Sequence, residues 1–119
     1  MATGLSENSF RPVVFSTLGV NGVGAANSQI VIPSNSYIDM ILFKETAGNA
    51  VTGGIKIGTT VGGTDIVSSQ AVPASTAGHI NDSTMQTRVF TAPQTLYIGA
   101  VSSWNGAKVN FTIIIGAIQ

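Results

Sequence analysis

The sequence has 119 residues, and its 5 basic and 5 acidic side chains leave no net formal charge. This balance excludes a basic surface for nucleic acid and a polybasic segment for anionic lipid. Only 8% of the residues are charged and the mean hydropathy is +0.37, so uncharged polar side chains and glycine must keep the protein soluble. We therefore expect copies of the chain or another protein to cover part of the surface, with no nucleic-acid or membrane partner.

The chain contains no cysteine, which excludes a disulfide framework, a thiolate nucleophile and a zinc knuckle. Its first ten residues lack the basic and apolar regions of a signal peptide. The longest apolar stretches, near 38–43 and 113–118, are far too short to cross a bilayer. The length fits one domain with one core.

The first predicted elements are an arm and a short strand. Residues 1–11 are small and polar and predict a flexible N-terminal arm in front of a single domain over 12–119. Residues 12–18 are rich in β-branched and aromatic side chains and predict a strand. Three glycines and two asparagines in 19–27 favour a loop after it.

Two strands follow, over 28–32 and 36–44, separated by a turn that begins at Pro33. Read with a period of two, the second strand has apolar side chains on both faces. One face would carry Ile38, Met40 and Leu42, and the other Tyr37, Ile41 and Phe43. Such a strand is expected to be covered on both sides, by the partner sheet and by a neighbour.

In the middle of the chain, residues 55–60 predict a strand. A two-residue turn at Gly62-Gly63 is predicted to join it to a strand over 64–67. Residues 68–83 are small and polar, which predicts a loop.

The last strands are predicted over 85–91, 94–101 and 108–115, with Asn105-Gly106 supplying positive φ for a tight hairpin turn. Alternation along the final strand predicts a core face of Val109, Phe111, Ile113 and Ile115. The whole pattern is about eight short strands with no competing helical period. It predicts an all-β fold, an antiparallel β-sandwich or jelly roll.

Few side chains are placed to carry chemistry. His79 is the only histidine, and one imidazole near one carboxylate, Asp82, does not make a catalytic or zinc site. The acids are not spaced as metal ligands: Glu7, Asp39, Glu45, Asp65 and Asp82. Asp39, in the middle of a strand, is expected to face solvent or to pair with a basic side chain. We expect no catalytic residue, metal or cofactor, and a structural or binding module rather than an enzyme.

Trp104 is the only tryptophan and lies beside the Asn105-Gly106 turn. Its ring could be a platform that stacks on a sugar or contacts a partner. Alternatively, it could pack over the end of the sandwich and close the core.

Four segments carry a resemblance to a known class of proteins. They are the run GGIKIGTTVGGTDIVSSQAV at 53–72, Arg88-Val89-Phe90, Gln94-Thr95-Leu96-Tyr97-Ile98 and Ser103-Trp104-Asn105-Gly106-Ala107. This half of the chain resembles β-rich modules of tailed-bacteriophage virion proteins, namely capsid decoration (cement), head-fibre or tail-fibre components. The resemblance implies a structural role in the virion, commonly as a homotrimer, after assembly in the host cytoplasm.

Two hypotheses of function follow. In the first, the protein decorates or stabilises a phage capsid as a homo-oligomer, expected to be a trimer, whose partner is the major capsid protein or another virion protein. In the second, it is the receptor- or carbohydrate-binding tip module of a phage fibre. Candidate residues for partner or ligand contact are Phe10, Arg11, Tyr97 and Trp104.

Overall fold

The computed structural model describes residues 15–25 and 28–118. The predicted arm over 1–11, with Phe10 and Arg11, therefore lies outside the described residues. The described residues form nine strands and no helix: β1 Phe15–Val23, β2 Ser28–Ile32, β3 Ser36–Glu45, β4 Ile55–Gly58, β5 Val67–Gln70, β6 Ala77–Asn81, β7 Val89–Phe90, β8 Gln94–Ala100 and β9 Val109–Ala117.

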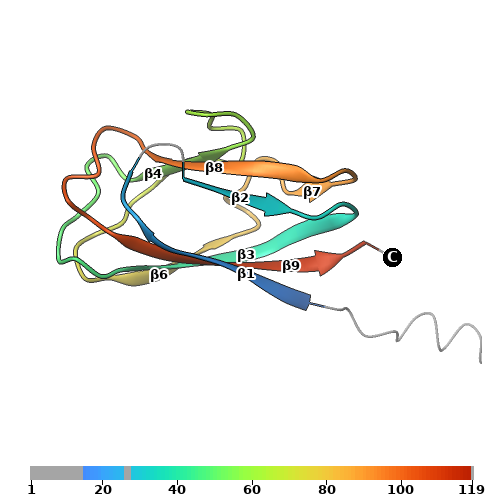
Figure 1. The fold of residues 1–119 in the computed structure, drawn as a ribbon, viewed down its shortest axis with the longest axis horizontal. Coiled ribbons are helices and arrows are strands. Elements are labelled where there is room, and N and C mark those ends of the chain that lie inside the picture. The colour runs from blue at the N-terminus through green and yellow to red at the C-terminus, as the bar shows by residue number, and fades with distance from the viewer. Residues whose placement is uncertain (1–14, 26–27, 119) are drawn as a thin grey trace, which may run out of the picture.

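The strands form two antiparallel sheets that lie as two layers (Figure 1). Sheet A has the order β1-β9-β3-β6, with the short β7 also paired to β3, and sheet B has the order β2-β8-β4-β5. Along the chain the pairs nest inside one another: β1 with β9, β2 with β8, β3 with β6, and β4 with β5. A long antiparallel hairpin rolled into two sheets has this connectivity, which is that of a jelly roll. The predicted all-β sandwich is confirmed.

β1 is longer than predicted, because its glycines do not end it. The loop predicted over 19–27 is wrong for its first five residues, which continue β1 to Val23. Gly19 stays in the regular ladder with β9, and a bulge between Val20 and Val23 contains Gly22 at φ 67°. A bulge uses the positive φ of glycine without stopping the strand.

The loop predicted over 68–83 is also wrong, since it contains most of β5 and all of β6. Both strands lie at the edge of a sheet and expose small polar side chains, so their composition is that of a loop although their backbones pair. The strand predicted over 64–67 is mostly loop, and the one predicted over 85–91 contracts to β7.

The faces predicted for β3 are wrong beyond Ile38. The register with β9 shifts between Ile38 and Met40, which makes Asp39 an extra residue in β3. An extra residue reverses the alternation of the side chains that follow it. Ile41 and Phe43 therefore join Ile38 in the core. The side chains on the outer face are those of Tyr37, Met40 and Leu42.

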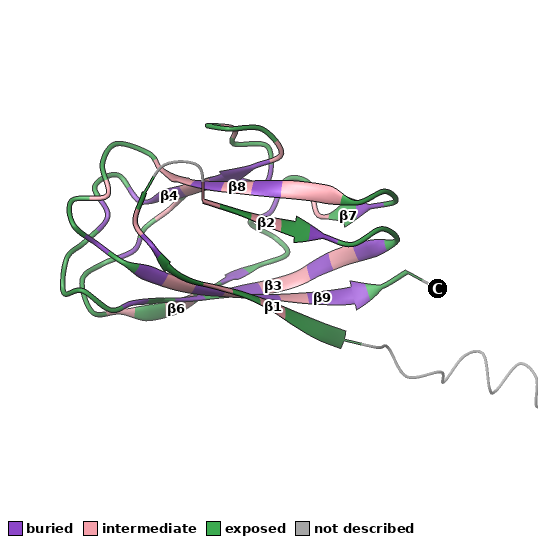
Figure 2. Cartoon of the chain, viewed as in Figure 1, coloured by how far each residue is buried: buried purple, intermediate pink, exposed green. Residues whose placement is uncertain are grey.

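A single core fills the space between the sheets, and the buried residues alternate along each central strand (Figure 2). Sheet A contributes the predicted face of β9, which is confirmed: Val109, Phe111, Ile113 and Ile115 are all buried. Sheet B contributes Ile55, Ile57, Leu96 and Ile98. Phe111, in the middle of β9, is the largest of the fully buried side chains among the described residues.

Replacing Phe111 with alanine is expected to destabilise the domain by about 3–5 kcal/mol, because burial is lost and a cavity remains. That is a large part of the roughly 5–15 kcal/mol that stabilises a small domain. The neighbouring Thr112 faces outward, so Thr112→Ala is the matched control and should change stability by less than about 1 kcal/mol. Urea denaturation of both variants measures the difference. An unchanged midpoint for Phe111→Ala would show that β9 is in the wrong register.

Candidate functional site

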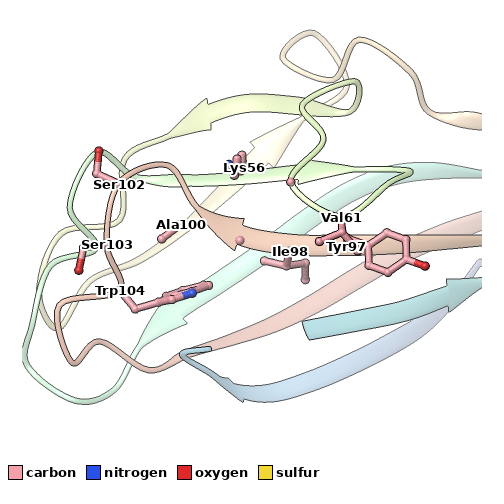
Figure 3. Close-up of a pocket in the computed structure, with 10 residues that line it drawn as sticks. Lys56, Val61, Tyr97, Ile98, Ala100, Ser102, Ser103 and Trp104 are labelled. Atoms are coloured by element: carbon pink, nitrogen blue, oxygen red, sulfur yellow. The ribbon is translucent and has the colours of Figure 1, made fainter. Parts of the chain in front are cut away.

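Tyr97 and Trp104, two of the predicted contact residues, line the same groove on sheet B. The groove has a volume of about 260 Å³, and we call it the Tyr97–Trp104 groove. Its lining consists of Lys56, Val61, Gly62, Tyr97, Ile98, Gly99, Ala100, Ser102, Ser103 and Trp104. The two aromatic rings lie at opposite ends of it, Tyr97 on β8 and Trp104 on the segment that follows β8 (Figure 3).

One wall of the groove is the connection between β4 and β5. The carboxylate of Asp65 accepts hydrogen bonds from the Thr59 hydroxyl at 2.5 Å and from the Thr59 backbone N–H at 2.8 Å. The Thr59 hydroxyl is the main cause that lowers the pKa of Asp65. A Cβ at Gly58 would lie 2.4 Å from the backbone of Gly63, so the loop can fold back only over a glycine. This eight-residue loop replaces the predicted two-residue turn and places Val61 beside Tyr97.

The other wall is formed by Trp104 and its turn. Asn105 and Gly106 have φ of 52° and 76°, and the Ala107 N–H donates to the Trp104 carbonyl at 2.8 Å, so the predicted positive φ is confirmed. The predicted hairpin is wrong, because β8 and β9 belong to different sheets and the turn lies in the crossing between them. Trp104 packs partly against the core and also lines the groove, so it has features of both roles considered for it.

The outer face of sheet A carries a second surface, which we call the sheet A patch. It consists of Phe15, Tyr37, Met40, Leu42, Val89 and Ile114. The Tyr37 ring lies over Gly116, where a Cβ would be 2.4 Å from the ring, and Arg88 lies 5.6 Å from the ring centroid. Phe15 and Val89 are more than half exposed. An antiparallel sheet that meets water normally presents polar side chains, so this face is suited to contact another protein.

Sequence reasoning missed most of these residues. Lys56 reaches the groove through the pairing of β4 with β8, and Ser102 lies in the segment that follows β8. No local pattern in the sequence indicates the place of either residue. The sheet A patch did have a signal, because apolar side chains occupy both faces of 36–44. The bulge at Asp39 then decides which of them face outward.

The titratable side chains that the structure describes do not gather into a site. His79 is exposed on β6, opposite Leu42 of β3. Asp82 forms an ion pair with Arg88 at 3.6 Å, and Asp39 lies half-buried in the bulge of β3. Among residues 15–25 and 28–118 no three acidic or histidine side chains are close enough to hold a metal ion. The same residues contain no helix that could span a membrane.

Glu45, at the end of β3, is the only buried acid among the described residues. Five backbone N–H groups donate to its carboxylate at 2.8–3.1 Å, those of Ala47, Gly48, Asn49, Ser75 and Lys108. Burial acts to raise the pKa of Glu45, but the hydrogen bonds outweigh it and lower the pKa from 4.5 to about 2. Since these donors occupy both oxygens, Glu45 holds three segments of chain together and is not placed to act as a base.

No protein-family model and no curated protein matches this sequence. The structure is similar to a chain of the Ralstonia phage GP4 capsid, with a TM-score of 0.53, 10% identity, and coverage of 92% of this chain and 86% of that chain. A weaker similarity is to the Tobacco streak virus coat protein, with a TM-score of 0.48, 12% identity, and coverage of 92% of this chain and 88% of that chain. Another is to a chain of the cyanophage Pam1 capsid, with a TM-score of 0.41, 10% identity, and coverage of 89% of this chain and 84% of that chain. At 10% identity the match to the Ralstonia phage GP4 chain shows a shared fold. At the level of the fold it confirms the resemblance to phage virion proteins.

The depressed pKa of Glu45 makes the stability of the domain depend on pH. The folded state holds the carboxylate ionised to lower pH than the unfolded chain, so its contribution is present above about pH 4.5 and is lost as the pH falls toward 2. Glu45→Gln places an amide NH₂ where backbone donors converge. It should lower the Tm at neutral pH and flatten the fall of the Tm below pH 4.5, as measured by circular dichroism.

Asp82→Asn is the matched control, because Asp82 is largely exposed and forms one ion pair. It should leave both the Tm and its pH profile nearly unchanged. A Glu45→Gln variant with the pH profile of the unchanged protein would contradict the role given to Glu45.

Proposed function

We propose that this protein is a non-enzymatic structural component of a phage virion, which decorates or stabilises the capsid as a homo-oligomer. The observation that carries the proposal is the jelly-roll fold, shared over 92% of this chain with a chain of the Ralstonia phage GP4 capsid. Because one fold can serve many functions, the surface has to support the same conclusion.

The surface supports a role in assembly. The sheet A patch is a group of apolar side chains that extends over β1, β9, β3 and β7, with the Arg88 guanidinium over its Tyr37 ring. A typical stable interface buries roughly 1,200–2,000 Å² in total, and its centre is depleted of charge. The proposed mechanism is burial of this face against other copies of the chain and against the major capsid protein or another virion protein. Assembly in the host cytoplasm needs no secretion signal.

The first test of this proposal is the mass of the purified protein. Light scattering should give about three times the chain mass of 12.2 kDa, as expected for a trimer, because self-association removes the apolar face from water. A monomer at high micromolar concentration would contradict self-association.

The same measurement locates the interface when it is made on two variants. Leu42→Lys places a charge in the sheet A patch and should shift the mass toward the monomer. Val101→Lys is the control, because Val101 has a similar exposure, 41% against 38% for Leu42, and lies outside the patch. Equal masses for the two variants would exclude the patch as the self-association surface.

A second function, binding of a carbohydrate receptor by a fibre tip, is favoured by the Tyr97–Trp104 groove. Aromatic rings stack on the C–H faces of sugars, and the groove adds the hydroxyls of Ser102 and Ser103 and the ammonium of Lys56. Its volume of about 260 Å³ suits a ligand about the size of one sugar ring.

Trp104 makes this second function directly testable, because it is the only tryptophan and its fluorescence reports on the groove. Titration with neutral and acidic monosaccharides should change the emission of Trp104 in a saturable way if the groove binds them. Tyr97→Ala should abolish the change and Tyr37→Ala, on the other sheet, should not. An emission that no sugar alters would remove this candidate.

A further inference from the structure

β1 forms one edge of sheet A, and β6 lies at the other. β9 pairs with one side of β1, and no described strand pairs with the other (Figure 1). From Phe15 to Val20 this edge has no proline, no charged side chain and no bulge, and its first residues are exposed (Figure 2). Soluble proteins usually protect such an edge with one of these features, because unpaired N–H and C=O groups attract another strand.

The outer face of β1 shows which strand would fit there. Leu18 and Val20 pair with inward-facing residues of β9 and pack against the core. Alternation then places Phe15, Thr17 and Gly19 on the outer face. Phe15 is 51% exposed, so a phenyl ring stands uncovered four residues from a glycine on the same face.

Elsewhere in this domain an aromatic ring covers a glycine directly opposite it on the neighbouring strand. Tyr37 of β3 covers Gly116 of β9, and Phe43 of β3 covers Gly78 of β6. In both cases a Cβ on the glycine would lie within 2.5 Å of the ring, so the glycine is required by the ring.

Among residues 15–25 and 28–118, no ring or other side chain requires a glycine at Gly19. Its φ is not in the left-handed region, and a Cβ there would find only the Phe111 carbonyl oxygen, at 3.9 Å. Glycine inside a strand lowers its stability and often marks the close approach of another group. Within the described residues nothing covers Gly19, and the exposed Phe15 ring of a second copy of the chain could cover it.

We propose that two copies pair their β1 strands antiparallel about a two-fold axis at Thr17, so that Phe15 of each copy covers Gly19 of the other. In this register Thr17 lies opposite its own counterpart and Ser16 lies opposite Leu18, so every outward residue meets an outward residue. The two A sheets become one continuous sheet with no charge at the junction. Two pairs within one chain show an aromatic ring that covers a glycine, and this contact would form the same kind of pair between two chains.

This contact rests on the self-association in the proposed function and specifies one of its surfaces. An isologous contact joins copies in pairs. Where the sheet A patch forms the trimer of the proposed function, this contact links one trimer to the next. The other edge strands, β2, β5, β6 and β7, have five residues or fewer. The first three contain no Phe, Tyr or Trp to cover a glycine, and Phe90 of β7 is buried in the core.

Single cysteines test the register, because the chain has none of its own. Directly opposite residues have Cα atoms about 4.5–5.5 Å apart, within the span of a disulfide. Thr17→Cys should therefore form a disulfide-linked dimer under mild oxidation on a non-reducing gel. Gly19→Cys should not, since its two copies would be roughly 13 Å apart. Ser68→Cys, on the exposed edge strand β5, controls for random collision.

A charge at the same position tests the contact without oxidation. Thr17 is exposed in the single chain, so Thr17→Lys should fold with an unchanged circular dichroism spectrum, while the two-fold axis brings two ammonium groups together. The dissociation constant of the association step that uses the β1 contact should rise at least tenfold by analytical ultracentrifugation, and Ser68→Lys should leave it unchanged.

The possible failures are distinguishable. An oligomeric protein in which Thr17→Cys cross-links no more than Ser68→Cys, or in which Gly19→Cys cross-links instead, would overturn the β1 contact and leave the proposed function standing. A protein that is monomeric at high micromolar concentration and does not cross-link would overturn both.

Discussion

The antiparallel pairing of β3 with β9, shifted once at Asp39, is the constraint on which both the core and the outer surface depend. In an unbroken register Ile41 and Phe43 would face outward, and Met40 and Leu42 would take their places inside. The shift instead buries Ile41 completely and leaves Leu42 38% exposed. The same extra residue that completes the core therefore creates an apolar outer face, which a solitary soluble domain would not be expected to present.

The surface that results carries little charge with which to stay in solution. Of the five acidic residues of the chain, Glu45 is buried and its carboxylate is enclosed by backbone N–H donors. Asp82 forms an ion pair with Arg88. The sheet A patch reaches the free edge of β1 at Phe15, so the apolar face and the unpaired backbone meet in one region of the molecule. The Tyr97–Trp104 groove lies on the other sheet. Assembly through sheet A would leave this groove open to solvent.

The sequence predicted the structure correctly where local residue patterns alone determine the conformation. The strict alternation of 108–115 predicted the core face of β9, and Asn105-Gly106 predicted a positive-φ turn. The predictions failed where pairing with a distant strand determines the conformation. β5 and β6 have the composition of a loop but pair as strands, and Gly22 lies in a bulge within β1 and does not end the strand. For the candidate site, Tyr97 and Trp104 were predicted as contacts, whereas Lys56 comes from a distant strand and no local pattern indicates its place.

Electron cryo-microscopy of phage particles that carry a tagged copy of this chain tests the central claim most directly, because it locates the protein in the virion. The account predicts a jelly roll on the outside of the capsid shell, with Tyr37, Met40 and Leu42 of sheet A buried against protein. Density for the chain at the tip of a fibre, with sheet A facing solvent and the Tyr97–Trp104 groove presented outward, would contradict the claim.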